Sequence, residues 1–317
     1  MAACEGTTFA AVDEMPSQAN ILEPTVRQHA ASSLTFQRRL SAWNRERLSP
    51  ALPSPDWLDR LEEDAEWLAL EGQFVEQERR TVSERGATAP RDADAFVGWF
   101  EALKHDGPGQ NDSLFAWLAE SAPLESMRWF LQQEVAGEAG FDDLVALTQV
   151  KLPQTAKLEL ARNYWDEQGQ GHASGVHGEL LTHLAKELSI ASSDDVAWES
   201  LALGNLMVAL AANRHYAYQS IGALGAIELT APGRSALVNQ GLKRLGVGGA
   251  ARRYFALHAT LDVKHSLAWN REVIAPLVAS DPRLATAIAE GALMRLNAGA
   301  RCFGRYRREL GLPPLRQ

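Results

Sequence analysis

Two histidines and an aspartate share one short segment in the last third of the chain. His258, Asp262 and His265 occupy positions i, i+4 and i+7 of a stretch that contains neither proline nor glycine. At about 100° per residue, a helix places these side chains within an arc of about 60° on one face. Neutral imidazole and ionised carboxylate are both good metal ligands. The spacing predicts half of a metal site. The alternative is that one or two histidines are buried in the core beside a solvated aspartate and bind no metal.

A second acid and imidazole flank a glycine-rich stretch. His177 follows Glu167 by ten residues, with Gly169, Gly171 and Gly175 between them. On an uninterrupted helix this offset leaves the two side chains about 80° apart. The glycines either unwind or bulge one helix, which would turn His177 toward Glu167, or end one helix so that His177 begins the next. Either arrangement makes this stretch a candidate for the other half of the site.

Composition limits the class of protein. The chain has 317 residues, of which 46% are hydrophobic, and a formal net charge of −9. An acidic surface repels phosphate backbones, which argues against a nucleic-acid partner. No apolar run is long enough to cross a bilayer, and the start of the chain lacks a signal-peptide pattern. Cys4 and Cys302 are the only cysteines, which favours a reducing, cytoplasmic location over a disulfide scaffold.

The hydrophobic pattern is helical almost throughout. Residues 1–33 lack periodicity, and we expect a poorly ordered N-terminal arm. Residues 34–317 are expected to form a single helical domain, with a metal-binding core at about 124–278. The expected helices cover 34–48, a segment opening at Pro55, 92–105, 112–120, 124–150, 155–168, 176–188, 194–228 with a break near Gly222 or Gly225, 232–245, the segment around His258, and 282–310. Residues 85–91 are expected to form a loop. Without alternating β-branched strands, the fold class is all-α, a single bundle of about eight to ten helices.

The two motifs together resemble a known family. The pattern Asp166-Glu167-x-Gly169-x-Gly171-x5-His177, followed by His258-x3-Asp262-x2-His265, is similar to the heme-oxygenase-like diiron oxidases, also described as iron-containing redox enzymes. The resemblance covers about residues 129–269. It implies a heme-oxygenase-like bundle in which the residues of both motifs bind iron. It also implies a glutamate about thirty residues before His258, which is Glu228.

Some members of this family add a glutamate from the helix before the first motif. Glu134 and Glu138 lie one helical turn apart and are expected to face the same way. We slightly favour Glu138 and leave Glu134 as the alternative. The metal ligands that the resemblance implies are therefore Glu134 or Glu138, Glu167, His177, Glu228, His258, Asp262 and His265.

The resemblance also implies a function. Three or four carboxylates with three imidazoles suit two iron ions, and O2 would be the co-substrate. The expected reaction is oxidation of a small amine, amino acid or fatty-acid-like substrate by N-oxygenation, desaturation or C–C cleavage. Two alternatives stay open: a haem-binding or haem-degrading protein, which would need one proximal histidine rather than an acid-rich set, and a non-catalytic helical protein with a structural metal site. An external electron donor and a homodimer are also left open.

Residues beside the motifs receive lesser roles. Glu159 and Asn163 precede Glu167 by eight and four positions, so we expect them to orient ligands. Asp166 is expected to be solvated or to cap a helix. The remaining histidines near the motifs are expected to be structural or to face the substrate rather than to bind metal; these are His172, His183 and His215.

Overall fold

The computed structural model describes residues 33–190 and 195–313. These residues form helices and no β-strand, apart from an isolated bridge between Gln168 and Val176, which confirms the all-α fold class. No helix in this part of the chain combines the length and apolar character required to span a membrane. The predicted N-terminal arm lies outside the described residues, except for Ser33.

The first half of the described chain contains α2 (Leu34–Leu48), α3 (Trp57–Arg80), α4 (Ser83–Ala87), α5 (Ala93–Asp106), α6 (Ser113–Glu120), α7 (Leu124–Gly137), α8 (Phe141–Thr148) and α9 (Gln154–Glu167). The second half contains α10 (His177–Glu187), α11 (Trp198–Ala212), α12 (Ala217–Arg244), α13 (Arg253–Ala268), α14 (Ala275–Ser280) and α15 (Leu284–Glu309). Short 3-10 turns precede α10 and α12, and a π-helix, Trp269–Ile274, joins α13 to α14.

Local signals explain several helix starts. The side chains of Ser33, Asp92 and Asp112 each accept a hydrogen bond from a backbone N–H in the first turn of α2, α5 and α6. Such N-caps satisfy donors that a helix leaves unpaired at its beginning. The loop expected at 85–91 is partly wrong, because α4 extends to Ala87.

Three expected boundaries differ, and close packing explains one of them. The segment 124–150 breaks at Gly140, whose φ of 74° is unsuited to a helix. The break expected near Gly222 or Gly225 lies instead at Asn213, before α12. A Cβ on Gly222 would lie 1.8 Å from the carbonyl oxygen of Ile288, so this glycine permits close helix packing. Pro232 lies inside α12 rather than at the start of another helix. The described residues form more helices than the eight to ten expected, and the short helices α4 and α14 are among the additional ones.

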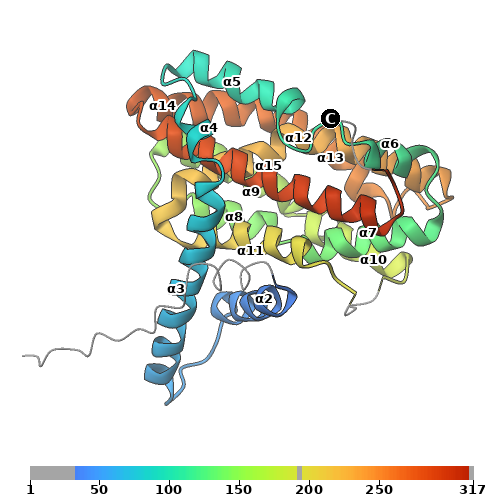
Figure 1. Ribbon diagram of the computed structural model, residues 1–317, viewed down its shortest axis with the longest axis horizontal. Coiled ribbons are helices and arrows are strands. Elements are labelled where there is room, and N and C mark those ends of the chain that lie inside the picture. The colour runs from blue at the N-terminus through green and yellow to red at the C-terminus, as the bar shows by residue number, and fades with distance from the viewer. Residues whose placement is uncertain (1–32, 191–194, 314–317) are drawn as a thin grey trace, which may run out of the picture.

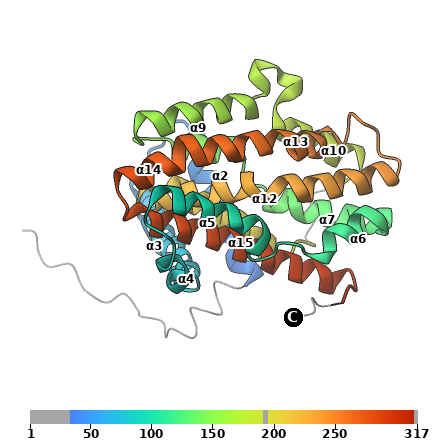
Figure 2. The ribbon, with the colours of Figure 1, turned by 90° about the horizontal axis from the view of Figure 1, so that it is seen from above.

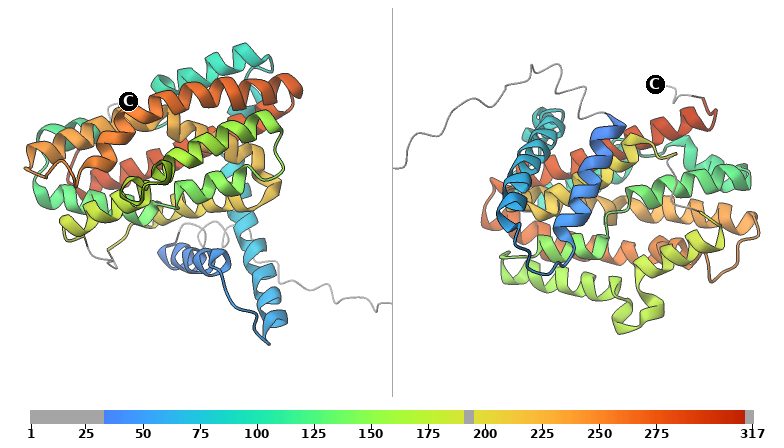
Figure 3. Two further views of the ribbon diagram at one scale, coloured as in Figure 1. Left: turned by 180° about the vertical axis from the view of Figure 1, so that it is seen from behind. Right: turned by 90° about the horizontal axis from the view of Figure 1, so that it is seen from below.

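The long helix α12 lies at the centre of the bundle. It packs against α13 on one side and α15 on the other (Figure 2). The neighbouring helix α11 is buried along most of its length between Glu199 and Ala211. In Figure 1, α3 extends below the bundle, and Figure 3 shows α2 lying beside it. Among the helices that carry the predicted ligands, α13 packs against both α12 and α10.

Candidate metal centre

A tight loop brings the first acid and imidazole together. Helix α9 ends at Glu167 and α10 begins at His177, with the two 3-10 turns between them and the Gln168–Val176 bridge closing the loop. Gly169 has a φ of +60°, and a Cβ there would lie 2.4 Å from the carbonyl carbon of Gly175. Only glycine fits this position. Of the two interpretations of the glycine-rich stretch, the second is therefore right: two helices meet rather than one helix bulging.

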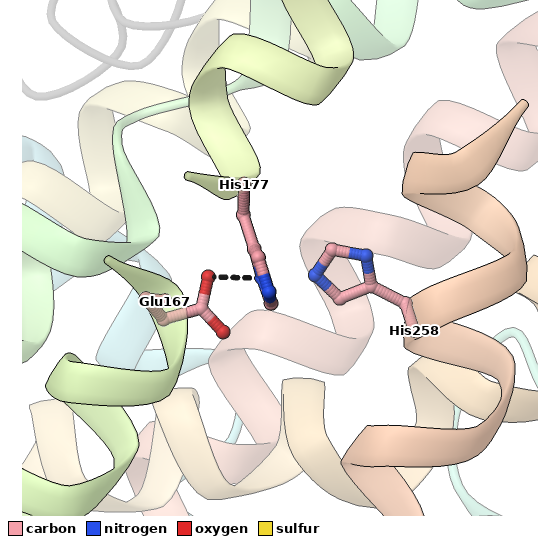
Figure 4. Close-up of side chains that lie close together, drawn as sticks. All are labelled: Glu167, His177 and His258. Atoms are coloured by element: carbon pink, nitrogen blue, oxygen red, sulfur yellow. Dashed lines mark ion pairs between the residues drawn. The ribbon is translucent and has the colours of Figure 1, made fainter. Parts of the chain in front are cut away.

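Helix α13 adds a second imidazole to this pair. His177 Nδ1 lies 2.6 Å from Glu167 Oε2, and the His177 and His258 ring centroids are 4.7 Å apart (Figure 4). One ligand atom from each of Glu167, His177 and His258 lies within 4.8 Å of the others. His258 Nδ1 donates to the carbonyl oxygen of Tyr254 at 2.8 Å, so the lone pair of Nε2 is available to a metal.

A second group lies beside the first. Glu228 from α12 and Asp262 and His265 from α13 also offer ligand atoms within 4.8 Å of one another, and all three are buried. His265 Nδ1 lies 3.5 Å from Glu228 Oε2. Asn163 from α9 donates its Nδ2–H to Glu228 Oε1 at 2.5 Å, which is the orienting contact expected of Asn163.

Asp166 has a different role from the one expected. Its Oδ2 lies 3.1 Å from His265 Nε2, so the carboxylate accepts the Nε2–H and directs Nδ1 toward Glu228. A carboxylate in this position fixes both the tautomer and the orientation of a metal-binding histidine. The prediction that Asp166 is solvated or caps a helix missed this contact, although the side chain is partly exposed. Glu159 is buried, but its hydrogen-bond partner is Arg162 rather than a ligand.

The structure leaves several ligand atoms unpaired in the interior. Among the described residues, Asp262 Oδ1 is buried and has no hydrogen-bond partner. His177 Nδ1 and His265 Nδ1 are also buried, and each lies near a carboxylate oxygen, at 2.6 Å and 3.5 Å, without forming a hydrogen bond. A buried polar atom without a partner costs about 1–3 kcal/mol. These atoms, on residues of both groups, fit a site whose remaining partners are metal ions.

The pKa values of the buried ligand residues also support a metal site. Burial and then the neighbouring Glu228 carboxylate raise the pKa of Asp262 to about 10. Burial raises the pKa of Glu167 to about 8, and burial lowers the pKa of His177 to about 4. Burial also lowers the pKa of His265, but the Glu228 and Asp166 carboxylates raise it further, to about 9. The crowded carboxylates therefore repel one another, and a metal cation would relieve that repulsion.

The two alternative glutamates occupy different surroundings. They do not face the same way along one helix as expected, because α7 ends at Gly137 and Glu138 lies beyond it, where its Oε1 accepts from the N–H of Gly140 at 3.0 Å. The charge of Glu138 acts on the pKa of Glu167. Glu134 instead has Arg234 as its strongest charged neighbour. Neither glutamate belongs to the two ligand groups of the described residues, so Glu138 stays a prediction as the additional ligand.

The ligand residues other than His265 line one cavity of about 190 Å³, together with apolar side chains from α7, α10, α11 and α12. The cavity walls include Glu134, Glu138, Glu167, His177, Glu228, His258 and Asp262. They also include three residues that the sequence analysis did not single out, Arg234, Tyr254 and Arg295. No motif marks these three, because only helix packing directs them into the cavity. His172, His183 and His215 are exposed and belong to neither ligand group.

Comparison with known proteins agrees with this geometry. A family model described as iron-containing redox enzyme matches residues 128–300. The matched stretch begins in α7 and ends in α15, so it includes both ligand groups as well as Glu134 and Glu138. No curated protein matches the chain.

Proposed function

Because the chain belongs to the family of iron-containing redox enzymes, whose model matches residues 128–300 of 317, we propose that it is a non-heme diiron oxidoreductase. Membership of the family supports an iron-dependent redox function. The finer proposal is that two iron ions and O2 oxidise a small amine, amino acid or fatty-acid-like substrate. N-oxygenation, desaturation and C–C cleavage are the reaction types that we propose.

One observation carries the diiron proposal. Two groups of three potential ligands lie side by side, and each combines carboxylate with imidazole. Hard carboxylate oxygens with borderline imidazole nitrogens suit iron, and bundle cores with inward-facing Glu and His are a known route to dinuclear centres. A haem site would need one proximal histidine rather than this set of acids.

Each ligand group would hold one iron ion. Glu167, His177 and His258 would hold one, and Glu228, Asp262 and His265 the other, with Glu138 as an additional carboxylate. Iron bound here would supply the electrons for reducing O2 and the oxidising power for the substrate. The chain's own residues perform the positioning: Asp166 fixes the His265 ring, the Tyr254 carbonyl fixes the His258 ring, and Asn163 fixes the Glu228 carboxylate.

The cavity would bind the substrate beside these ligands. Its apolar walls would exclude water and hold an aliphatic group against the metal positions. An engineered cavity of about 150 Å³ accommodates benzene, so a cavity of about 190 Å³ is suited to a small substrate.

The proposal is tested by metal content and O2 uptake. The purified protein, loaded anaerobically with Fe(II), should bind two irons per chain, show no Soret band, and consume O2. His258→Ala and Asp262→Ala should each lower bound iron to one per chain or fewer and abolish O2 consumption. His183→Ala, an exposed histidine on α10, is the matched control and should bind two irons. A Soret band in the purified protein, or unchanged iron in both site variants, would contradict the proposal.

The same assay distinguishes Glu138 from Glu134 as the additional iron ligand. Glu138→Gln should weaken iron binding about tenfold or more, because it removes a charged ligand. Glu134→Gln should leave iron stoichiometry at two, since Glu134 faces the arginines. The opposite ranking would assign the ligand role to Glu134.

A further inference from the structure

Two arginines line the candidate metal cavity. Arg234 lies on α12 and Arg295 on α15, and both side chains are half-buried against the cavity. Arg234 donates to Thr230 Oγ1 at 3.1 Å, and its guanidinium carbon lies 5.9 Å and 5.6 Å from the ring centroids of Phe115 and Phe303. The Nε–H of Arg295 is buried and has no hydrogen-bond partner. Within residues 33–190 and 195–313, neither guanidinium forms an ion pair with a carboxylate.

This lack of an ion pair distinguishes them from arginines elsewhere in the fold. Several other arginines that reach buried carboxylates form direct ion pairs: Arg47 with Glu71, Arg79 with Glu290, Arg301 with Glu78 and Arg307 with Asp112. A charge withdrawn from water is costly unless an opposite charge and hydrogen bonds compensate it. Arg234 and Arg295 therefore present unused hydrogen-bond donors and positive charge to the cavity.

The charges around the cavity leave room for one more anion. Burial and then the charge of Arg295 lower the pKa of Arg234 to about 10, so the two cations are close enough to repel each other. The carboxylate with the strongest effect on the pKa of Arg234 is Glu134. Glu134 acts on both guanidinium groups, and Glu138 also acts on Arg295. With Glu138 assigned to the metal, the two guanidinium groups share one carboxylate, and a ligand carrying a single negative charge would balance the remaining positive charge.

We propose that Arg234 and Arg295 bind the carboxylate of the substrate. This inference rests on the proposed function, and it narrows the substrate class to carboxylic acids, excluding simple amines. The planar guanidinium fork matches the two oxygens of a carboxylate. A phosphate dianion is a poorer match, since Glu134 already supplies one negative charge. The apolar part of the substrate would lie along the cavity wall, with its oxidisable end toward the metal ligands.

The helix geometry gives the approximate size of this substrate. Arg234 follows Glu228 by six residues on α12, which separates the two by about 9 Å along the helix axis. The carboxylate therefore lies several bonds from the atom that reacts. With a cavity of about 190 Å³, a monocarboxylic acid of roughly six carbons is the expected size class.

Calorimetry on the full-length protein tests this proposal with hexanoate and its uncharged analogue hexanamide. Hexanoate should bind both the iron-free and the iron-loaded wild type on the order of 100-fold more tightly than hexanamide, because truncating one member of a buried charge pair has an effect of that size. Arg234→Gln and Arg295→Gln should each lose most of this preference, and Arg234→Lys should lose part of it. Arg271→Gln, an exposed arginine outside the cavity, is the matched control and should behave as wild type.

Two results would overturn the inference. One is equal binding of hexanoate and hexanamide to the wild type, a comparison that requires no variant to fold. The other is an unchanged preference in folded Arg234→Gln and Arg295→Gln proteins, which would mean that hexanoate binds elsewhere. The iron-free measurement separates this inference from the proposed function. Carboxylate preference without iron binding or O2 uptake would refute the diiron proposal alone, whereas two bound irons without carboxylate preference would refute the arginine site alone.

Discussion

Removing the Asp166 carboxylate should lower the affinity for iron at one of the two positions and leave the affinity at the other unchanged. Asp166 contacts His265, a ligand of the second group only, through the 3.1 Å contact from Nε2 to Oδ2. In Asp166→Ala this ring nitrogen loses its acceptor, and Nδ1 is no longer held toward Glu228. The iron at Glu228, Asp262 and His265 should therefore bind less tightly.

The magnitude follows from the environment of the contact. Loss of a carboxylate that orients a metal-binding histidine typically reduces metal affinity 10- to 100-fold, or about 1.4–2.7 kcal/mol. The Asp166 side chain is 25% exposed and His265 only 6%. Water therefore screens part of the interaction, and we expect the lower part of this range, about 10- to 30-fold.

An anaerobic Fe(II) titration against a competing chelator measures both binding steps. In Asp166→Ala one step should weaken by this factor and the other should match the wild type. Glu159→Gln is the matched control, because Glu159 is a buried acid on the same helix whose hydrogen-bond partner is Arg162. Wild-type affinity at both steps of Asp166→Ala, or equal weakening in Glu159→Gln, would refute the orienting role of Asp166.

Two further perturbations test the loop and the buried charges. Gly169→Ala should destabilise the protein by about 2 kcal/mol or more and reduce bound iron, because Gly169 has a φ of +60° and an added Cβ would meet Gly175. Gly72→Ala is the control, because a Cβ at Gly72 meets nothing within 4 Å. This variant should leave the iron content unchanged in the same metal assay. Without iron, Tm should fall by several degrees from pH 7 to pH 8. The reason is that three buried groups have raised pKa values in the native state: Glu167 about 8 instead of 4.5, Asp262 about 10 instead of 3.8, and His265 about 9 instead of 6.5. The native state then retains protons that the unfolded state has released, and stability is lost as pH rises toward those native values. Calorimetric scans of iron-loaded protein should show a smaller change, since bound metal keeps the carboxylates ionised; an iron-free Tm that rises over this interval would contradict the assignment.

Short-range patterns predicted much of the helical framework. The start of α2 at Leu34 and the helix carrying His258 follow from capping residues and from the absence of helix breakers. Breaks were harder to predict, because Gly222 could either end a helix or allow another helix to approach. The carbonyl oxygen of Ile288, 1.8 Å from a Cβ built on Gly222, decides this question, and it belongs to a helix 66 residues away in the chain.

The spacing alone shows that His258, Asp262 and His265 share one face of a helix, because the direction of side chains along a helix depends only on its 3.6-residue period. The spacing does not show that these three residues divide between two ligand groups. His258 lies beside His177, whereas Asp262 and His265 lie beside Glu228. Seven residues span about 10 Å of helix axis, too far for one metal ion, so the helices that pack against α13 decide which partner meets each end. The same reason applies to Asp166 and to the two cavity arginines, whose roles depend on side chains from helices that are distant in the chain.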